Sequence, residues 1–211
     1  MSASREHASR NAAKFDAWAP TFEDKRFDFF RRMQKRVLDL VDLRKGAAFL
    51  DIGCGTGWAV RTAAGIVGPG GSAHGIDLSS RMIQEAKQAA HGIGNAHFQT
   101  ANAEGLPFAR NSFDSIICTM SFHHYLDPEK AVGEMARVLK PGGKVCIVDP
   151  TADFFVVKWA DKLIKRMEAE HVGMYSSREF GRFFEGAGLR SIESKRPMFL
   201  WFTVKAHLAM N

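Results

Sequence analysis

Cysteine is scarce in this sequence, and long apolar runs are missing. Only 3 cysteines occur among 211 residues, an odd number with no Cys-x-x-Cys spacing. This usage excludes a disulfide framework and a structural zinc site, so no metal site is expected. The longest apolar runs, Ser115–Met120 and Phe154–Val157, fall far short of the roughly 18 residues that a membrane helix requires.

A secretory signal is also missing, because no apolar stretch follows the charges of Met1-Ser-Ala-Ser-Arg-Glu-His. Together with the cysteine usage, this predicts a soluble cytoplasmic protein. Hydrophobic residues make up 45% and charged residues 25%, which is an ordinary globular balance. The length favours a single domain over residues 1–211.

Charge and aromatic residues are unevenly distributed along the chain. The net charge is +4 over residues 1–45, −1 over 46–150 and +3 over 151–211, and 16 of the 23 aromatic residues lie outside the middle. This division predicts a core scaffold at 46–150, an N-terminal helical cap at 1–45, and substrate-side helices and final strands at 151–211. Flanking helices that simply bury phenylalanine and solvate lysine remain an alternative to a ligand-binding cover.

The middle of the chain alternates short β-type runs with helix-type stretches, which is typical of a parallel sheet with helices on its faces. The expected strands are Ala47–Ile52, a strand ending at His74–Asp77, Ala96–Thr100, Phe113–Met120 and Lys144–Val148. The expected helices are Trp58–Ile66, Arg81–Ala90, Glu129–Leu139, Phe154–Ala169 and Ser177–Ala187. Ser79 or Ser80 is expected to cap the second helix, and Gly186-Ala-Gly188 is expected to end the last one.

Ahead of the core, residues Phe27, Phe30, Met33, Val37, Leu40 and Val41 share one helical face. We expect this helix to dock onto the sheet. Its basic face leaves peripheral contact with an anionic surface as an alternative.

The strongest local signal is Phe49-Leu-Asp-Ile-Gly-Cys-Gly-Thr-Gly57, in which a buried strand leads to three glycines and a helix. Glycine allows a tight turn and a close approach of backbone to ligand. Asp77 follows 20 residues later, at the end of the second strand, where a carboxylate can accept both hydroxyls of a ribose. The glycine spacing and the missing Gly-Lys-Ser/Thr argue for an adenosine-like ligand without a required pyrophosphate.

At this point the sequence resembles the class I S-adenosylmethionine-dependent methyltransferases, in particular the type 11 group with the ubiquinone/menaquinone C-methyltransferases. The resemblance covers about residues 47–149. Six motifs carry it in order: Leu50-Asp-Ile-Gly-Cys-Gly-Thr-Gly57, Gly75-Ile-Asp-Leu-Ser79 with Met82, Asn102-Ala-Glu-Gly-Leu-Pro-Phe108, Phe113-Asp114, His123-His124 and Arg137-Val-Leu-Lys-Pro-Gly-Gly143. It implies a three-layer α/β/α Rossmann-like fold with a mostly parallel seven-stranded sheet and an antiparallel last strand.

The resemblance also implies a set of cofactor-binding residues for S-adenosylmethionine. The methionine part would contact Asp51 and the loop of Gly53, Cys54, Gly55 and Gly57, with Met120 and Ser121 at its border. Asp77 would hold the ribose, and Leu78 and Met82 would sandwich the adenine. Asn102 stands where the family usually has aspartate, next to Ala103 and Glu104 at the adenine edge.

The histidines at the end of the fourth strand are candidates for catalysis. His123 and His124 lie at the carboxyl edge of the expected sheet, where open α/β folds bind ligands. Histidine is suited to general-base work near neutral pH, although such residues also simply shape pockets. Methyl transfer from a sulfonium is an in-line displacement that needs mainly positioning, so a base is required only where the acceptor loses a proton.

The acceptor pocket is expected to come from the aromatic flanks. The candidate pocket residues are Phe15, Trp18, Phe22, Tyr125, Trp159, Tyr175 and Trp201. An aromatic, electropositive cover favours a small apolar or aromatic acceptor, and core packing would explain many of the same aromatic residues. Phe22 stands where the family usually has tyrosine.

Several other acceptors fit the sequence less well. Ser121-Phe-His-His-Tyr replaces the motif of exocyclic-amine nucleic-acid methyltransferases, and no proline precedes a cysteine. RNA stays as an alternative because the flanks are basic. A second alternative is a protein of the same fold that binds the cofactor or a partner without catalysis. The acceptor, the methylated atom and the oligomeric state do not follow from the residues.

Overall fold

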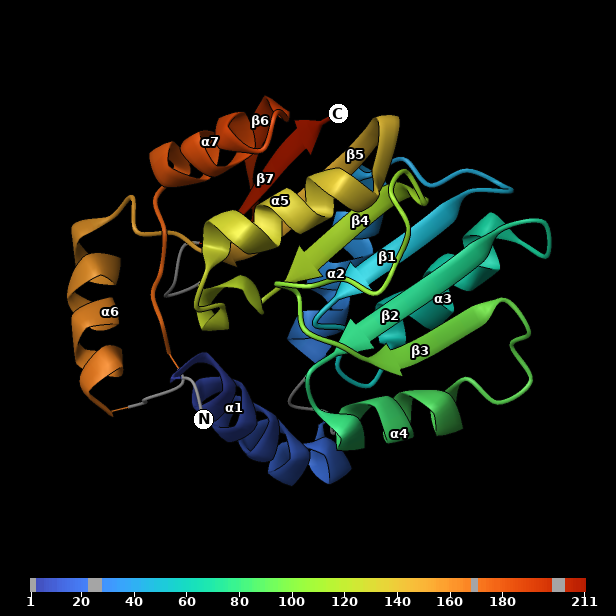
Figure 1. The fold of residues 1–211 in the computed structure, drawn as a ribbon, viewed down its shortest axis with the longest axis horizontal. Helices are drawn as coiled ribbons and strands as arrows, with labels where there is room; N and C mark the ends of the chain where they lie inside the picture. The colour runs from blue at the N-terminus through green and yellow to red at the C-terminus, as the bar shows by residue number, and fades with distance from the viewer. Residues whose placement is uncertain (1–2, 23–27, 168–170, 199–203) are drawn as a thin grey trace.

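The computed structural model describes residues 3–22, 28–167, 171–198 and 204–211, which form a sheet with helices on both faces (Figure 1). The strand order is β3-β2-β1-β4-β5-β7-β6. The strands are β1 Ala48–Ile52, β2 Ser72–Asp77, β3 Ala96–Thr100, β4 Phe113–Thr119, β5 Leu139–Pro150, β6 Arg190–Met198 and β7 Val204–Met210. All pairs from β3 to β5 are parallel, and β7 is antiparallel to both neighbours. The predicted sheet is confirmed.

Two helical layers cover the sheet because successive strand residues point to opposite faces. The helices are α1 Ala3–Trp18, α2 Asp28–Leu40, α3 Trp58–Val67, α4 Ser80–Ala89, α5 Pro128–Val138, α6 Phe155–Met167 and α7 Ser177–Gly186. On one face, Phe49 and Ile117 pack in a core that includes residues of α2, α3 and α4. On the other face, Leu50 and Ile116 pack with residues of α5 and α7. This arrangement confirms the three-layer α/β/α fold.

The helix boundaries follow from capping chemistry. Ser79 accepts a hydrogen bond from the Met82 N–H at the start of α4, and Ser176 forms a capping box with Glu179 at the start of α7. Asp127 caps α5, where Pro128 occupies the first turn.

One strand is longer than expected. β5 was predicted over Lys144–Val148 and extends over Leu139–Pro150. Leu139 pairs with Phe113, and Gly142 (φ +75°) donates its N–H to the Asn211 carbonyl. α5 thus ends at Val138, one residue before the expected Leu139, and the extended backbone continues because it finds hydrogen-bond partners.

The two N-terminal helices take different places. The apolar face of α2 behaves as expected, since Met33, Val37 and Val41 are buried against the sheet; Phe27 lies outside the described residues. α1 was not predicted as a separate helix, and it lies beside α4 instead of packing on either face of the sheet (Figure 1). Asp16 of α1 accepts hydrogen bonds from the Ser79 hydroxyl and the Arg81 N–H at the start of α4. α1 is thus anchored beside the carboxyl ends of the strands.

Candidate functional site

A cavity of about 290 Å³ opens where β1, β2 and β4 end, and α1 covers it. Open parallel α/β sheets bind their ligands at this edge, in the crevice outside the carboxyl ends of the strands. Residues of the glycine loop, the start of α4, the end of β4 and the α1 face line it together.

The glycine loop after β1 has a backbone that other residues rarely adopt. Gly53 has φ +77°, and a Cβ at this position would lie 2.2 Å from the Ser121 Oγ. Gly55 has φ +52°, and the ring of Phe22 lies over it. Absence of side chains at these two positions keeps the end of β1 open to the cavity. Gly57 caps α3 and packs against Phe98 instead of lining the cavity.

A first test of this loop is Gly53→Ala, with Gly65→Ala on α3 as the matched control because a Cβ there meets open space. The added methyl group at Gly53 must displace Ser121, and the positive φ is strained for alanine. We expect S-adenosylhomocysteine affinity to fall at least tenfold and the melting temperature to drop, as measured by calorimetry. Affinity within twofold of the unmodified protein would contradict a close backbone approach.

Asp77 lies at the end of β2 and shapes the loop. Its carboxylate accepts hydrogen bonds from the Gly55 N–H (2.9 Å) and the Ser79 N–H (2.9 Å). Burial raises the pKa of Asp77, and these backbone donors oppose that rise. The residue lines the cavity with its neighbour Leu78, as does Met82. The structure thus brings together three of the residues expected around the nucleoside.

Asp51 is a fully buried carboxyl group behind the glycine loop. Neither oxygen has a hydrogen-bond partner among the described residues. Burial, and then the negative charge of Asp77, raise the pKa of Asp51 to about 8. An unpaired buried carboxylate is costly unless a cation or donor reaches it. An ammonium group of a ligand in the loop would supply that partner.

The elevated pKa predicts how stability depends on pH. An unfolded aspartate has a pKa of about 3.9, so between that value and about 8 the folded protein binds more protons at Asp51. The unfolding free energy therefore falls as pH rises, by up to about 1.4 kcal/mol per pH unit for this group, and levels off above pH 8. We expect urea unfolding from pH 5 to 8.5 to show a flatter profile in Asp51→Asn. Identical profiles would refute the raised pKa.

The loop after β3 supplies the far end of the cavity. Asn102, Ala103 and Glu104 all line it. The Asn102 Oδ1 accepts a hydrogen bond from the Glu104 N–H (2.9 Å). The Glu104 carboxylate accepts from the Leu126 N–H (3.0 Å) and the Asp127 N–H (3.2 Å), so it fixes the start of α5.

Asn102→Asp should strengthen nucleoside binding, because a carboxylate is a stronger acceptor than an amide oxygen. We expect a roughly three- to tenfold gain in S-adenosylhomocysteine affinity, about 1 kcal/mol. Asn111→Asp adds the same charge at an exposed turn and serves as the control. Equal or weaker binding by Asn102→Asp would contradict the placement of this residue at the adenine.

Met120, the residue directly after β4, lines the cavity in a strained backbone conformation. Met120 has φ +54°, uncommon for a side chain of this size, and its N–H donates to the Val148 carbonyl at 2.7 Å. Ser121 follows, and its Oγ lies 2.9 Å from the Tyr125 hydroxyl. Burial raises the pKa of Tyr125 well above its ordinary value, so the phenol stays neutral. Cys54 also lines the cavity, and burial raises its thiol pKa.

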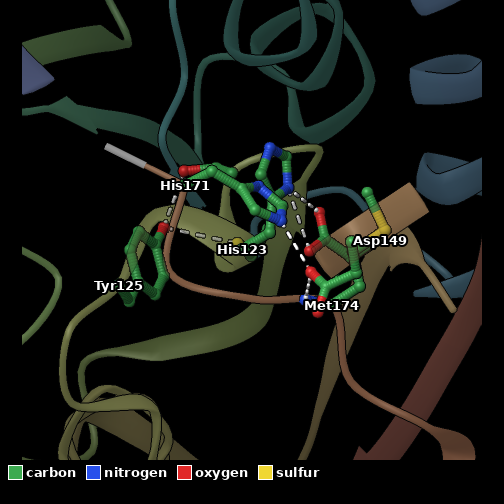
Figure 2. Close-up of polar contacts among 8 residues, drawn as sticks. His123, Tyr125, Asp149, His171 and Met174 are labelled. Atoms are coloured by element: carbon green, nitrogen blue, oxygen red, sulfur yellow. Dashed lines mark hydrogen bonds and ion pairs between the residues drawn. The ribbon is translucent and has the colours of Figure 1, made fainter. Parts of the chain in front are cut away.

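His123 is held by a buried carboxylate. Its Nδ1 lies 3.0 and 3.1 Å from the two oxygens of Asp149, which follows β5 residue Val148 and is fully buried (Figure 2). If Nδ1 donates to the carboxylate, Nε2 is the unprotonated nitrogen. The ring lines the cavity. A carboxylate that fixes tautomer and orientation is the arrangement of a general base.

A second histidine–aspartate pair stands beside the first. The His171 Nε2 lies 2.7 Å from the Asp161 Oδ1 on α6, and the His171 ring centroid is 5.5 Å from that of His123 (Figure 2). The Asp161 carboxylate also accepts from the Met174 N–H and pairs with Lys165. Asp149, Asp161 and His171 were not anticipated from the sequence. The one available signal was that Asp149 directly follows the predicted strand Lys144–Val148.

His124 has a different environment from His123. Its carbonyl lies 3.0 Å from the His7 Nε2, and its ring meets Phe15 edge-on at 5.3 Å between centroids. Both histidines line the cavity. His124 thus ties α1 to the end of β4, whereas His123 is the one oriented by a carboxylate.

The predicted acceptor residues divide into those at the cavity and those away from it. Phe15, Trp18, Phe22 and Tyr125 line it. Trp159 is 63% exposed on α6 and is not part of the lining. Tyr175 packs against Phe122, Phe180 and Phe183 in the core instead. Trp201 lies outside the described residues.

Further lining that sequence reasoning did not anticipate comes from α1 and α2. These residues are His7, Ala8, Asn11, Lys14, Phe30, Arg31 and Gln34. In α1 they repeat every three or four positions up to Trp18, the spacing of one helical face. That spacing was a signal, but the face mixes polar and apolar residues and so lacks an amphipathic pattern.

The fold, the glycine loop and the acidic end of β2 define a nucleoside-binding α/β protein. A family model described as a methyltransferase domain matches residues 50–147. The demethylmenaquinone methyltransferase of Staphylococcus aureus strain JH9 is 32% identical over 187 residues, 79% of this chain and 77% of that protein. The nocamycin O-methyltransferase of Saccharothrix syringae is 34% identical over 148 residues, 69% of this chain and 53% of that protein.

A methyltransferase solved in complex with the Haloferax volcanii Trm112 activator has a TM-score of 0.78 at 23% identity, covering 93% of this chain and 96% of that one. The chain belongs to the class I S-adenosylmethionine-dependent methyltransferases, in the type 11 group. It spans about half the length of the first curated relatives that it matches. Among the described residues, no helix is long and apolar enough to span a membrane.

The site residues fit the family's cofactor, S-adenosylmethionine. The orphaned carboxyl of Asp51 can receive the ammonium of the methionine part, and the open backbone at Gly53 leaves room for it. The Asp77 carboxylate lines the cavity and can accept from ribose hydroxyls. Within the described part of the chain, no group of three or more His, Cys, Asp or Glu side chains is arranged to hold a metal ion.

Proposed function

We propose that this protein transfers the methyl group of S-adenosylmethionine to a small apolar or aromatic acceptor. The observation that carries the proposal is a single cavity shared by the nucleoside-binding residues, His123 and the rings of Phe15 and Trp18. The bound cofactor supplies an activated methyl group on a sulfonium. The chain's own residues position the two reactants and keep water out.

The chain would hold the cofactor along the carboxyl edge of the sheet. Asp77 accepts from the ribose, Leu78 and Met82 enclose the adenine, and Asn102 accepts from the adenine amino group. Asp51 and the loop of Gly53 to Gly57 take the methionine part, with Met120 and Ser121 at its border. All of these except Asp51 and Gly57 line the cavity, and Asp51 is fully buried next in sequence to the lining residue Ile52.

We assign the general base to His123, with Asp149 as its positioning residue. Asp149 accepts from Nδ1–H, so Nε2 takes the proton of an acceptor hydroxyl or acidic C–H as methyl transfer proceeds. The neutral phenol of Tyr125 is unsuited to this step because burial raises its pKa. His124 shapes the pocket and anchors α1 through His7.

The acceptor's character follows from the α1 cover. Phe15 and Trp18 pack edge-to-face with 5.6 Å between centroids, and the Lys14 ammonium lies 5.3 Å from the Trp18 ring. Such a surface suits a planar acceptor with a hydroxyl or partial negative charge. Two relatives, a nocamycin O-methyltransferase and a demethylmenaquinone methyltransferase, are named for acceptors of this kind. The buried free thiols of Cys54, Cys118 and Cys146 support a reducing, cytoplasmic location.

The proposal is tested by a methyl-acceptor screen with S-adenosylmethionine labelled in its methyl group. Purified protein is incubated with quinols, simple phenols, lipids and, separately, RNA. Label in a quinol or phenol supports the proposal, and label in RNA alone would replace it with the RNA alternative. Binding of S-adenosylhomocysteine without transfer to any acceptor would favour the non-catalytic alternative.

A further inference from the structure

Helix α6 presents an apolar stripe that no described residue covers. Trp159, Leu163 and Met167 have exposed fractions of 63%, 44% and 76%. They recur every four residues, so they lie along one side of the helix. Exposed apolar side chains gathered in this way mark an interaction surface rather than chance exposure.

The opposite side of α6 is fixed to the protein. Val157 and Asp161 are buried, and Asp161 holds His171, Lys165 and the Met174 N–H. The stripe therefore cannot turn inward without breaking these contacts. Figure 1 shows α6 (orange) at the edge of the molecule, beyond the layer of α5 and α7.

A row of cations runs alongside the stripe. Lys158, Lys162 and Arg166 are exposed, and they also recur every four residues. α6 contains four basic residues against the single acidic residue Asp161. The helix thus combines a tryptophan-bearing apolar side with a basic side.

We propose that α6 docks on an anionic membrane surface, lying parallel to it. Interfacial helices carry Trp and Leu on one face and Lys or Arg on the other, the composition seen here. Lysine and arginine side chains near an anionic leaflet are attracted to its negative surface potential. A protein partner fits less well, because lysine is depleted from protein–protein interfaces.

The docking surface and the candidate site are physically connected. The inner side of α6 holds His171 through Asp161, and the His171 ring stands beside His123 (Figure 2). Docking would place the methyl-transfer site near a bilayer that holds apolar acceptors. This interpretation of why the protein docks rests on the proposed function. The membrane contact itself does not.

The test is cosedimentation of the full chain with two kinds of vesicle. One consists of phosphatidylcholine alone, and the other also contains roughly 30% phosphatidylglycerol as the anionic lipid. We expect binding to the anionic vesicles only, weakened by salt. The variants are Trp159→Ser with Leu163→Ser, and Lys158→Glu with Lys162→Glu. The matched controls are Ile66→Ser on α3 and Lys87→Glu on α4, which are also exposed.

We expect each α6 double variant to lose at least tenfold in vesicle affinity while both controls keep it. A cooperative thermal unfolding transition verifies that the variants are folded, and calorimetry with S-adenosylhomocysteine separates the two proposals. No binding by the unmodified protein, or equal binding by α6 variants and controls, overturns the docking surface. An oligomer that dissociates in the α6 variants would instead assign the stripe to a second copy. Docking without methyl transfer would refute the proposed function alone.

Discussion

Replacing Asp77 with alanine is expected to abolish S-adenosylhomocysteine binding, with affinity at least a hundredfold lower than in the unmodified protein. The carboxylate would make two hydrogen bonds to the ribose, and each bond to a charged group contributes about 1.5–3 kcal/mol. It also holds the Gly55 and Ser79 N–H groups, so its loss loosens the loop. Isothermal titration calorimetry measures the effect.

Two further variants interpret that result. Asp77→Asn keeps one acceptor oxygen, so its S-adenosylhomocysteine affinity should lie between those of the unmodified protein and Asp77→Ala. Asp114→Asn removes a carboxylate that accepts from the Ala48 N–H and Lys140 but does not line the cavity, so it should leave affinity unchanged. Unaltered affinity in a folded Asp77→Ala protein would remove the basis of the nucleoside assignment.

The second large effect is expected at His123. With an acceptor that must lose a proton, His123→Ala should lower kcat by about 10²–10⁴, the usual contribution of a general base. S-adenosylhomocysteine affinity should stay the same, because no cofactor contact is assigned to this ring. Added imidazole should restore part of the rate.

Asp149→Asn tests whether the carboxylate acts through His123. It should lower kcat with little change in KM, because the histidine loses its fixed tautomer while the pocket keeps its shape. His97→Ala on the exposed face of β3 is the control. Full activity in both His123→Ala and His124→Ala would show that acceptors are methylated without a histidine base.

The nucleoside-binding residues could be anticipated because their signal is local. A strand, a tight glycine turn and a helix follow one another within Phe49–Val67, and parallel pairing brings Asp77 to the same edge. Capping residues such as Ser79 gave the helix boundaries for the same reason. Short-range patterns therefore predicted the parallel sheet with helices on its faces and the nucleoside-type loop, and the family resemblance added the three-layer fold and the cofactor roles.

The acceptor side depended on long-range packing that no short pattern encodes. The His123–Asp149 pair joins the turn after β4 to the neighbouring strand β5, and His171 reaches it from a segment after α6. Tyr175 and Trp159 share the aromatic composition of a pocket, yet one packs in the core and the other faces outward. Amino-acid composition alone does not distinguish an aromatic ring in the pocket from one in the core or on the surface.

The central claim, a cavity built for S-adenosylmethionine, is tested most directly by titrating the purified protein with S-adenosylmethionine and with S-adenosylhomocysteine. The account predicts saturable binding of both ligands at one site, with Kd on the order of micromolar. Absence of heat or saturation with either ligand, in protein that unfolds cooperatively, would contradict it.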